Sequence, residues 1–323
     1  MSSKPLFRSL ALVAACLVSW NAQAQSYPNR PIRFIVPYTP GGLPDVVARI
    51  LAQRLGENIN QSVTVDNKPG AMGSVAAASL LTSPADGYTF LLTDTAMLTV
   101  GPLLPRSLSF DPKKDLVPVS LVGNSPLYLA INQQTPATSF DEFAAYAKAK
   151  PGGVSYGSSG QGTIHHLAGE AMGISLKLPM THIPYKGSAP SVTALVAGQV
   201  DMVFTAHSNV AGFAKSGQVK LLAVSTGKRS ATTPGIPALG ETIASYDYSV
   251  TIAVLGRSGI PDEVIARISS ELGNVIRRPD VQKQLQGLGM TPSGAGSVEL
   301  ANVLKDESGR MSELFKTAKI KID

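Results

Sequence analysis

A short apolar strand, a glycine-containing loop and a helix follow one another in residues 33–49, RFIVPYTPGGLPDVVAR. Residues 34–36 are apolar and β-prone, and the prolines and glycines of 37–42 then interrupt regular structure. Pro44 and Asp45 are typical of a first helical turn. Such a loop presents backbone N–H groups at the positive end of a helix dipole and therefore favours anions. The alternative is an ordinary strand-to-helix turn.

A second loop of the same kind lies much further along the chain. Residues 154–156 predict a short strand, the segment 157–163 (GSSGQGT) predicts a loop, and residues 164–176 have helical spacing. Two such loops, each leading into a helix, indicate two α/β halves that face each other across a ligand.

The N-terminus has the pattern of a secretory signal. Lys4 and Arg8 supply a basic start, residues 10–20 an apolar run, and Ala24 ends a small-residue cleavage site. The apolar run is shorter than the roughly 20 residues that a membrane span needs. We therefore expect residues 1–24 to be a signal peptide and the mature protein to be exported.

Composition narrows the function classes. Cleavage removes the only cysteine, Cys16, and the only tryptophan, Trp20, so packing without disulfides must stabilise the mature chain. Cys16 also ends a segment similar to a lipoprotein box, which leaves a lipid anchor as an alternative. Only 15% of residues are charged, and no dense basic run carries interleaved aromatic residues. We expect no nucleic-acid partner, despite a pI near 9.3.

Strands and helices alternate almost throughout, which predicts an α/β protein with largely parallel sheets. Predicted linkers at 124–126 and 226–245 divide the chain into a discontinuous first lobe, 25–124 with 246–323, and a second lobe, 125–245. Two crossings between the lobes would form a hinge. Besides the two loop units, strands are predicted at 63–65, 88–92, 117–122, 127–131, 182–185, 200–204, 219–224 and 249–255, and helices at 74–81, 140–150, 186–197, 210–215, 262–277, 281–288 and 298–318.

Small and hydroxylated residues gather after the predicted strands, where open α/β sheets bind ligands. Turn formation and helix capping favour the same residue types and are the alternative. The candidates are Thr39, Gly41 and Gly42, then Thr93 and Thr95, then Ser158, Ser159 and Thr163, and finally Lys186, Gly187 and Ser188.

Two carboxylates stand among these candidates. We interpret Asp45 first as a helix-start residue, because near the helix dipole it would compete with an anion for N–H groups, and second as a ligand contact. Asp94 either points away from the site or meets an ammonium, hydroxyl or ring N–H of the ligand.

The histidines do not predict a metal site. His165 and His166 are adjacent on a helix and diverge by about 100°, so both cannot bind one metal. His166 and Glu170 are four residues apart, but no third ligand has matching spacing. We expect His165 and His166 to pack or to hydrogen-bond the loop, and we assign no role to His182 or His207.

A serine hydrolase is the remaining enzymatic alternative, because Ser158 and Ser159 lie near histidines. The nucleophile elbow G-x-S-x-G fails, since counting from Gly157 its last position is Gln161. No third residue is placed to orient a base. We therefore expect a protein that is not an enzyme and that has no cofactor.

Long, ordered segments resemble the Bug family, the extracytoplasmic solute receptors of tripartite tricarboxylate transporters. They run from about Pro28 to the C-terminus and include VPYTPGGLPDVVARILAQRL, DNKPGAMGSVAAASL, SPADGYTFLL, YGSSGQGTIHHLAGE and HIPYKGSAPSVTALVAGQVDMVF. The resemblance implies a type II periplasmic binding protein: two α/β lobes joined by a two-crossing hinge that closes like a Venus flytrap. It also implies a carboxylate ligand and delivery to a permease with one large and one small subunit. We expect a monomer; a ligand sensor that signals to a membrane protein is the alternative.

The resemblance also implies positions for the ligand site. Three departures from the family pattern bear on ligand choice: Asp94 replaces a small hydroxyl residue, Thr205 stands where Asp is frequent, and 248–254 lacks the usual tryptophan. The implied contacts are Tyr38, Thr39, Gly41 and Gly42 in the first carboxylate loop, Ser158, Ser159, Gly162 and Thr163 in the facing loop, Thr93, Asp94 and Thr95 in the second loop of the first lobe, and Lys186, Gly187 and Thr205 at the border.

Overall fold

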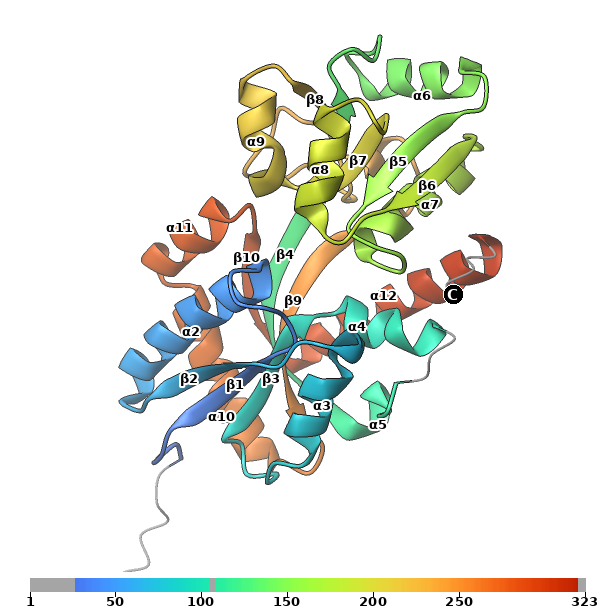
Figure 1. The fold of residues 1–323 in the computed structure, drawn as a ribbon. Helices are drawn as coiled ribbons and strands as arrows, with labels where there is room; N and C mark the ends of the chain where they lie inside the picture. Colours follow the sequence, from blue (N-terminus) through green and yellow to red (C-terminus); the bar gives the residue numbers. More distant parts are fainter. Residues whose placement is uncertain (1–26, 105–107, 319–323) are drawn as a thin grey trace, which may run out of the picture.

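The computed structural model describes residues 27–104 and 108–318. The predicted signal peptide, 1–24 with Cys16, lies outside these residues. The described chain forms two α/β lobes, one above the other in Figure 1. None of its helices has both the length and the apolar character that crossing a bilayer requires.

The first lobe, the lower one in Figure 1, is built on a mixed sheet. Its strands lie in the order β2 (Val63–Asn67), β1 (Ile32–Val36), β3 (Thr89–Asp94), β9 (Ser249–Arg257), β4 (Leu116–Asn132) and β10 (Thr291–Gly296).

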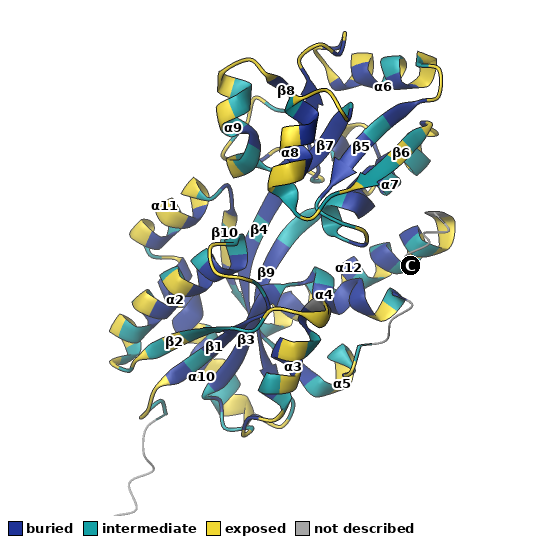
Figure 2. Ribbon diagram, viewed as in Figure 1, coloured by how far each residue is buried: buried dark blue, intermediate teal, exposed yellow. Residues whose placement is uncertain are grey.

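Successive residues of these strands enter two different cores, as the period-2 alternation of a strand requires. Phe34, for example, packs beneath α2 (Leu43–Ile59), α10 (Asp262–Ile276) and α11 (Pro279–Gly287), whereas its neighbour Ile35 packs beneath α3 (Ser74–Leu81) and the start of α12 (Ser297–Ala318). Both faces of the sheet are therefore covered, and Figure 2 shows buried strands between helices with exposed outer faces. Short helices α4 (Ala96–Thr99) and α5 (Pro112–Asp115) and the 3₁₀ turns η2 (Ala71–Gly73) and η3 (Gly101–Leu103) complete the lobe.

The second lobe repeats the three-layer plan. Its sheet has the order β8 (Val219–Val224), β4, β7 (Met202–Ala206), β5 (Val154–Ser158) and β6 (Met180–Pro184). α6 (Phe140–Ala149) and α7 (Ile164–Leu176) cover one face, and α8 (Ser188–Val196) and α9 (His207–Lys215) cover the other. The return segment holds a 3₁₀ turn, η4 (Leu239–Glu241).

The predicted linker at 124–126 is instead the middle of one strand, β4, which runs through both lobes. Up to Pro126 this strand pairs with β9, and from Leu127 onward it pairs with β7 and β8. The ladder with β9 is bulged twice, between Pro118 and Ser120 and between Leu121 and Gly123. Pro126, which has no N–H to donate, is tolerated because it stands where the strand changes partners. The next residue, Leu127, pairs with the other lobe, and the N–H of Leu127 donates to Ser225 Oγ at 3.0 Å.

The prediction of largely parallel sheets is correct only around β1 and β5. Each of these strands has parallel neighbours on both sides, whereas every pairing of β4 and β9 is antiparallel. The physical reason is that β4 and β9 cross between the lobes in opposite directions. β10, which the sequence did not predict, also pairs with β4 antiparallel, and a bulge between Pro292 and Ala295 interrupts this pairing.

The C-terminal helix α12 is a further connection between the lobes. Leu300 in its first half is fully buried in the first-lobe core, while Met311 and Leu314 in its second half are buried in the second-lobe core. The predicted lobe division assigns the whole of this helix to the first lobe, but its side chains pack in both.

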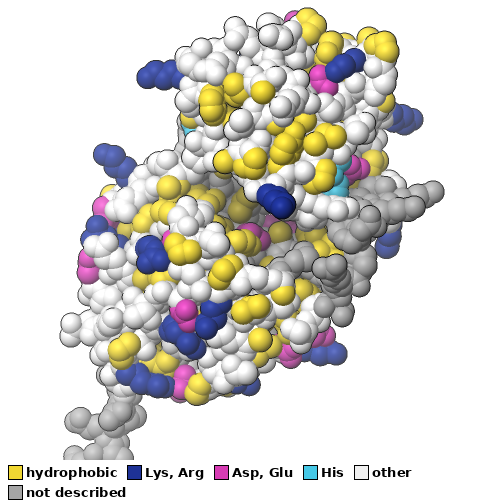
Figure 3. Space-filling model, viewed as in Figure 1, with side chains coloured by type: hydrophobic (Ala, Val, Ile, Leu, Met, Phe, Trp, Pro, Cys, Tyr) yellow, Lys and Arg dark blue, Asp and Glu magenta, His cyan; other side chains and the backbone are white. Residues whose placement is uncertain are grey.

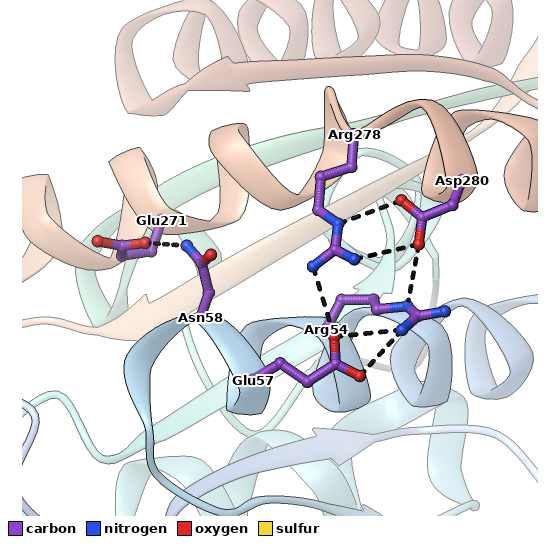
Figure 4. Close-up of polar contacts among 6 residues, drawn as sticks. All are labelled: Arg54, Glu57, Asn58, Glu271, Arg278 and Asp280. Atoms are coloured by element: carbon purple, nitrogen blue, oxygen red, sulfur yellow. Dashed lines mark hydrogen bonds and ion pairs between the residues drawn. The ribbon is translucent and has the colours of Figure 1, made fainter.

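Polar contacts join α2 to α10 and α11 on the outer face of the first lobe (Figure 4). Asn58 Nδ2 donates to the buried Glu271 at 2.5 Å, and Arg54 and Glu57 form ion pairs with Asp280 and Arg278. These exposed ion pairs are individually weak, but together with the apolar contacts below them they fix the orientation of α2. The loop at the N-terminus of α2 therefore lies on a rigid support.

Candidate functional site

The first glycine loop joins β1 to α2 on the side of the first lobe that faces the second (Figure 1). Gly42 is the N-cap residue of α2, and no side chain caps the helix there. Gly41 has φ +88° and is exposed, with open space where a side chain would lie. The loop therefore presents main chain at an uncapped helix N-terminus, which suits an anion.

Asp45 orders this loop from inside. Its carboxylate is almost fully buried and accepts hydrogen bonds from Gly41 N–H at 2.8 Å, from Arg49 at 2.9 and 3.1 Å, and from Asn67 Nδ2 at 2.9 Å. Burial would raise the pKa of Asp45, but the hydrogen bonds from Arg49, Gly41 and Asn67 outweigh it and lower this pKa. Asn67 also donates to Tyr38 O at 3.0 Å. In this structure Asp45 is thus a helix-start residue that fixes the loop, and Asn67 is a supporting residue that the sequence analysis missed.

Replacing Asp45 with alanine should lower the free energy of unfolding by about 2 kcal/mol, because Gly41, Arg49 and Asn67 lose the buried carboxylate that accepts their hydrogen bonds. Chemical denaturation of the ligand-free protein measures the change. Arg49→Ala is the control and should cost less than about 1 kcal/mol, since the Arg49 side chain is 54% exposed. Equal denaturation midpoints for the Asp45 and Arg49 variants would contradict this role.

The second loop of the first lobe follows β3 and is linked to the first loop. Tyr38 Oη donates to Asp94 Oδ2, and Ala96 N–H donates to Asp94 Oδ1 at 3.1 Å. Burial raises the pKa of Asp94 and the pKa of Tyr38. Thr93 and Thr95 are buried, so Asp94, which is half-buried, is the most accessible of the three residues. Asp94 therefore accepts from the first residue of α4 and connects the two loops.

The facing loop, 158–163, joins β5 to α7 in the second lobe. Ser158 is fully buried, and its Oγ bonds to the main chain of Gly160, whereas Ser159 is half-buried. Thr163 is the N-cap of α7, and its Oγ1 accepts from His166 N–H at 3.5 Å. Gly187 N–H donates to Ser159 O at 3.1 Å and ties the start of α8 to this loop.

Three histidines lie against loop 158–163. The prediction that His165 and His166 pack on the loop or hydrogen-bond it is confirmed: His165 Nδ1 lies 2.8 Å from Ser159 Oγ, and His166 Nδ1 accepts from Gly162 N–H at 3.0 Å. His182, which received no predicted role, lies with Nε2 2.7 Å from Ser158 Oγ.

Two predicted border residues differ in accessibility. Lys186 is exposed between β6 and α8, where its charge can reach solvent or an anion. Thr205 is buried on β7, and its Oγ1 accepts from Asn209 at 3.1 Å. Of these two residues, only Lys186 therefore has a solvent-exposed side chain.

The two lobes approach one another beside these loops. Thr95 from the first lobe and Ile164, at the start of α7, line one small cavity together with Glu307 and Arg310 of α12. Burial raises the pKa of Glu307, although hydrogen bonds from Thr95 and Thr251 oppose the shift. Figure 3 shows the surface hollowed between the lobes on the face that carries the loops, with a basic side chain at the edge of the hollow.

The comparisons with known proteins agree with this architecture. Residues 47–320 match the model of the tripartite tricarboxylate transporter family receptor. The chain is 32% identical to the protein BugT of Bordetella pertussis over 96% of both chains.

Solved structures of carboxylate-bound proteins are also similar to this chain. One of an R. palustris protein with adipate has a TM-score of 0.80 and 29% identity, covering 91% of this chain and 99% of that one. MatC from Rhodopseudomonas palustris, with bound malate, has a TM-score of 0.74 and 25% identity, covering 89% and 99%. The family match spans most of the chain, and the fold is that of a two-lobed periplasmic binding protein. The chain therefore belongs to the tripartite tricarboxylate transporter receptor family, whose members are solute-binding receptors and not enzymes.

Proposed function

We propose that this protein captures a small organic carboxylate between its two lobes and delivers it to a tripartite tricarboxylate-type membrane transporter with one large and one small permease subunit. The observation that carries the proposal is the pair of strand-to-helix loops, one per lobe, on lobe surfaces that face each other. Each loop leads into a helix N-terminus, whose dipole attracts carboxylates and phosphates, although Asp45 accepts from Gly41 N–H in the first loop and Thr163 caps α7 in the second. The adipate and malate in the structures of two relatives support the same ligand class.

The ligand would be held mainly by the exposed and half-buried groups of the site. Gly41, Gly42 and Ser159 offer main chain or hydroxyl at the loops, and Lys186 adds a positive charge. The remaining proposed contacts and positions near the ligand are Tyr38, Thr39, Asp45, Thr93, Asp94, Thr95, Ser158, Gly162, Thr163, Gly187 and Thr205.

Export of the chain and its division into lobes belong to the same proposal. Residues 1–24 act as a signal peptide that is removed, or Cys16 carries a lipid anchor, and the mature receptor is a periplasmic monomer. The lobes divide as 25–124 with 246–323, and 125–245. The pairing partners of β4 change between Pro126 and Leu127, two residues beyond the first of these boundaries.

A melting screen of the mature protein tests the ligand class. A bound carboxylate at a hundredfold excess over its dissociation constant should add about 2.7 kcal/mol to the free energy of unfolding, because it binds only the folded state. Adipate, malate, tricarboxylates and aromatic acids form the panel, and the neutral diamide of adipate is the matched control. The proposal predicts stabilisation by at least one carboxylate and none by the diamide. A panel with no stabilising carboxylate would refute it.

A further inference from the structure

We propose that His166 and His182 are positioning residues for the carboxylate, each fixing a different point of loop 158–163 through one particular ring nitrogen. The inference rests on the proposed function, in which this loop holds the ligand. It goes further by assigning the geometry of the loop to two imidazoles behind it, one on α7 and one on β6.

His166 fixes the loop through Nδ1. This nitrogen accepts from Gly162 N–H at 3.0 Å, and the ring is buried. A nitrogen that accepts carries no proton, so the neutral ring has its proton on Nε2. Nε2 lies 3.7 Å from Glu170 Oε1, too far for a direct hydrogen bond but on the side of the ring that faces the carboxylate. The hydrogen bond from Gly162 therefore fixes the orientation of the His166 ring.

His182 fixes the loop through its other ring nitrogen, Nε2, which lies 2.7 Å from Ser158 Oγ. The same hydroxyl oxygen accepts from Gly160 N–H at 3.1 Å. His182 thus holds the side chain that closes the first turn of the loop. This contact joins β6 to the end of β5, and the two residues that form it are 24 positions apart in the sequence.

The two imidazoles form one stack with Tyr156. The rings of His166 and His182 lie 3.9 Å apart between centroids and 13° from parallel, and Tyr156 lies 4.9 Å from His182. Tyr156 Oη also donates to Glu170 Oε1 at 2.5 Å. Burial and the neighbouring His166 lower the pKa of His182 to about 4, so His182 is neutral at pH 7. The titratable groups that face the pair are thus Tyr156 on β5 and Glu170 on α7.

A simple packing role would need only the ring shapes, whereas the positioning role needs a particular nitrogen at each site. This difference allows a crossed design. The amide group of asparagine occupies the place of Nδ1, and that of glutamine the place of Nε2. H166N and H182Q keep the required polar atom, while H166Q and H182N lose it, and each residue serves as the control for the other.

The first measurement is amide hydrogen exchange of Gly160 and Gly162 by NMR in the ligand-free protein. We expect Gly162 to exchange about tenfold faster in H166Q than in the wild type and to stay within about twofold in H166N. Gly160 should exchange about tenfold faster in H182N and not in H182Q. Equal exchange in the paired variants would overturn the proposal, whether or not a carboxylate binds.

The second measurement is the affinity for adipate, or for malate if adipate does not bind. H166Q and H182N should bind about tenfold more weakly, and H166N and H182Q should bind like the wild type, because a displaced loop loses roughly one hydrogen bond. If the wild type binds neither probe nor any carboxylate of the panel, the proposed function fails while the exchange data still decide the positioning role. If the wild type binds and the paired variants bind alike, the positioning role alone is refuted.

Discussion

Replacing Gly153 with alanine should lower the free energy of unfolding by about 3 kcal/mol or more, the largest effect that we expect from a single methyl group in this protein. Gly153 precedes β5, is buried and has φ +77°, a conformation that alanine adopts only with strain. A Cβ atom there would lie 2.0 Å from Pro179 O and 2.6 Å from its carbonyl carbon. Pro179 O cannot retreat freely, because it accepts from Val154 N–H at 3.0 Å.

Gly152 supplies the matched control for this substitution. It has φ +79°, nearly the same strain, but nothing lies within 4 Å of the added Cβ. Gly152→Ala should therefore cost about 1 kcal/mol, the strain alone. Urea denaturation followed by circular dichroism gives both values, and equal losses in the two variants would show that the Pro179 contact is unimportant.

Leu314→Ala should destabilise the second lobe, although Leu314 lies in the C-terminal segment of the chain. Leu314 is 7% exposed and packs in the core formed by α6, α7 and β5. Truncating a buried leucine costs about 2–5 kcal/mol. Hydrogen exchange followed by mass spectrometry should show faster exchange in peptides from α7, which α12 contacts, than in the wild type.

Leu300→Ala is the control from the same helix. Leu300 is fully buried in the first-lobe core beside α3 and β9. Its removal should cost a similar amount but accelerate exchange in α3 and not in α7. If both variants loosened only the first lobe, α12 would not connect the two cores as the structure indicates.

The sequence predicted the bounds of a helix or strand correctly wherever a local residue pattern determines that element. The predicted helices at 74–81 and 164–176 and the strand at 219–224 have the bounds that the structure gives to α3, α7 and β8. Thr163 caps the start of α7, and Pro179 stands two residues beyond Lys177, where the helix ends. Such signals are local, so they do not depend on the rest of the fold.

Elements that depend on distant partners could not be predicted in the same way. β10 contains one proline and two glycines, and only its pairing with β4 makes it a strand. The unbroken course of β4 through 124–126 depends on β9, which follows more than a hundred residues later. Pairing of this kind leaves no alternating pattern within a short window.

The residues of the candidate site likewise fall into those with a local sequence signal and those without one. Both glycine loops were identifiable because proline, glycine and helix-start residues stand next to one another in the sequence. The supporting residues were not: Asn67 reaches Asp45 from the neighbouring strand, and His182 reaches Ser158 from β6. Sequence spacing says nothing about these pairs, since they depend on the parallel pairing of β2 with β1 and of β6 with β5 across long crossover connections.

The unbroken β4 has a mechanical consequence for the way in which the lobes can move. A chain of main-chain hydrogen bonds resists stretching and shearing, so the lobes cannot separate or slide independently. A change of this angle requires torsion of β4 and β9 near Pro126 and Leu127, where the pairing partners of β4 change, together with a shift of α12, which packs in both cores. The resting angle between the lobes is thus an elastic property of two strands and one helix.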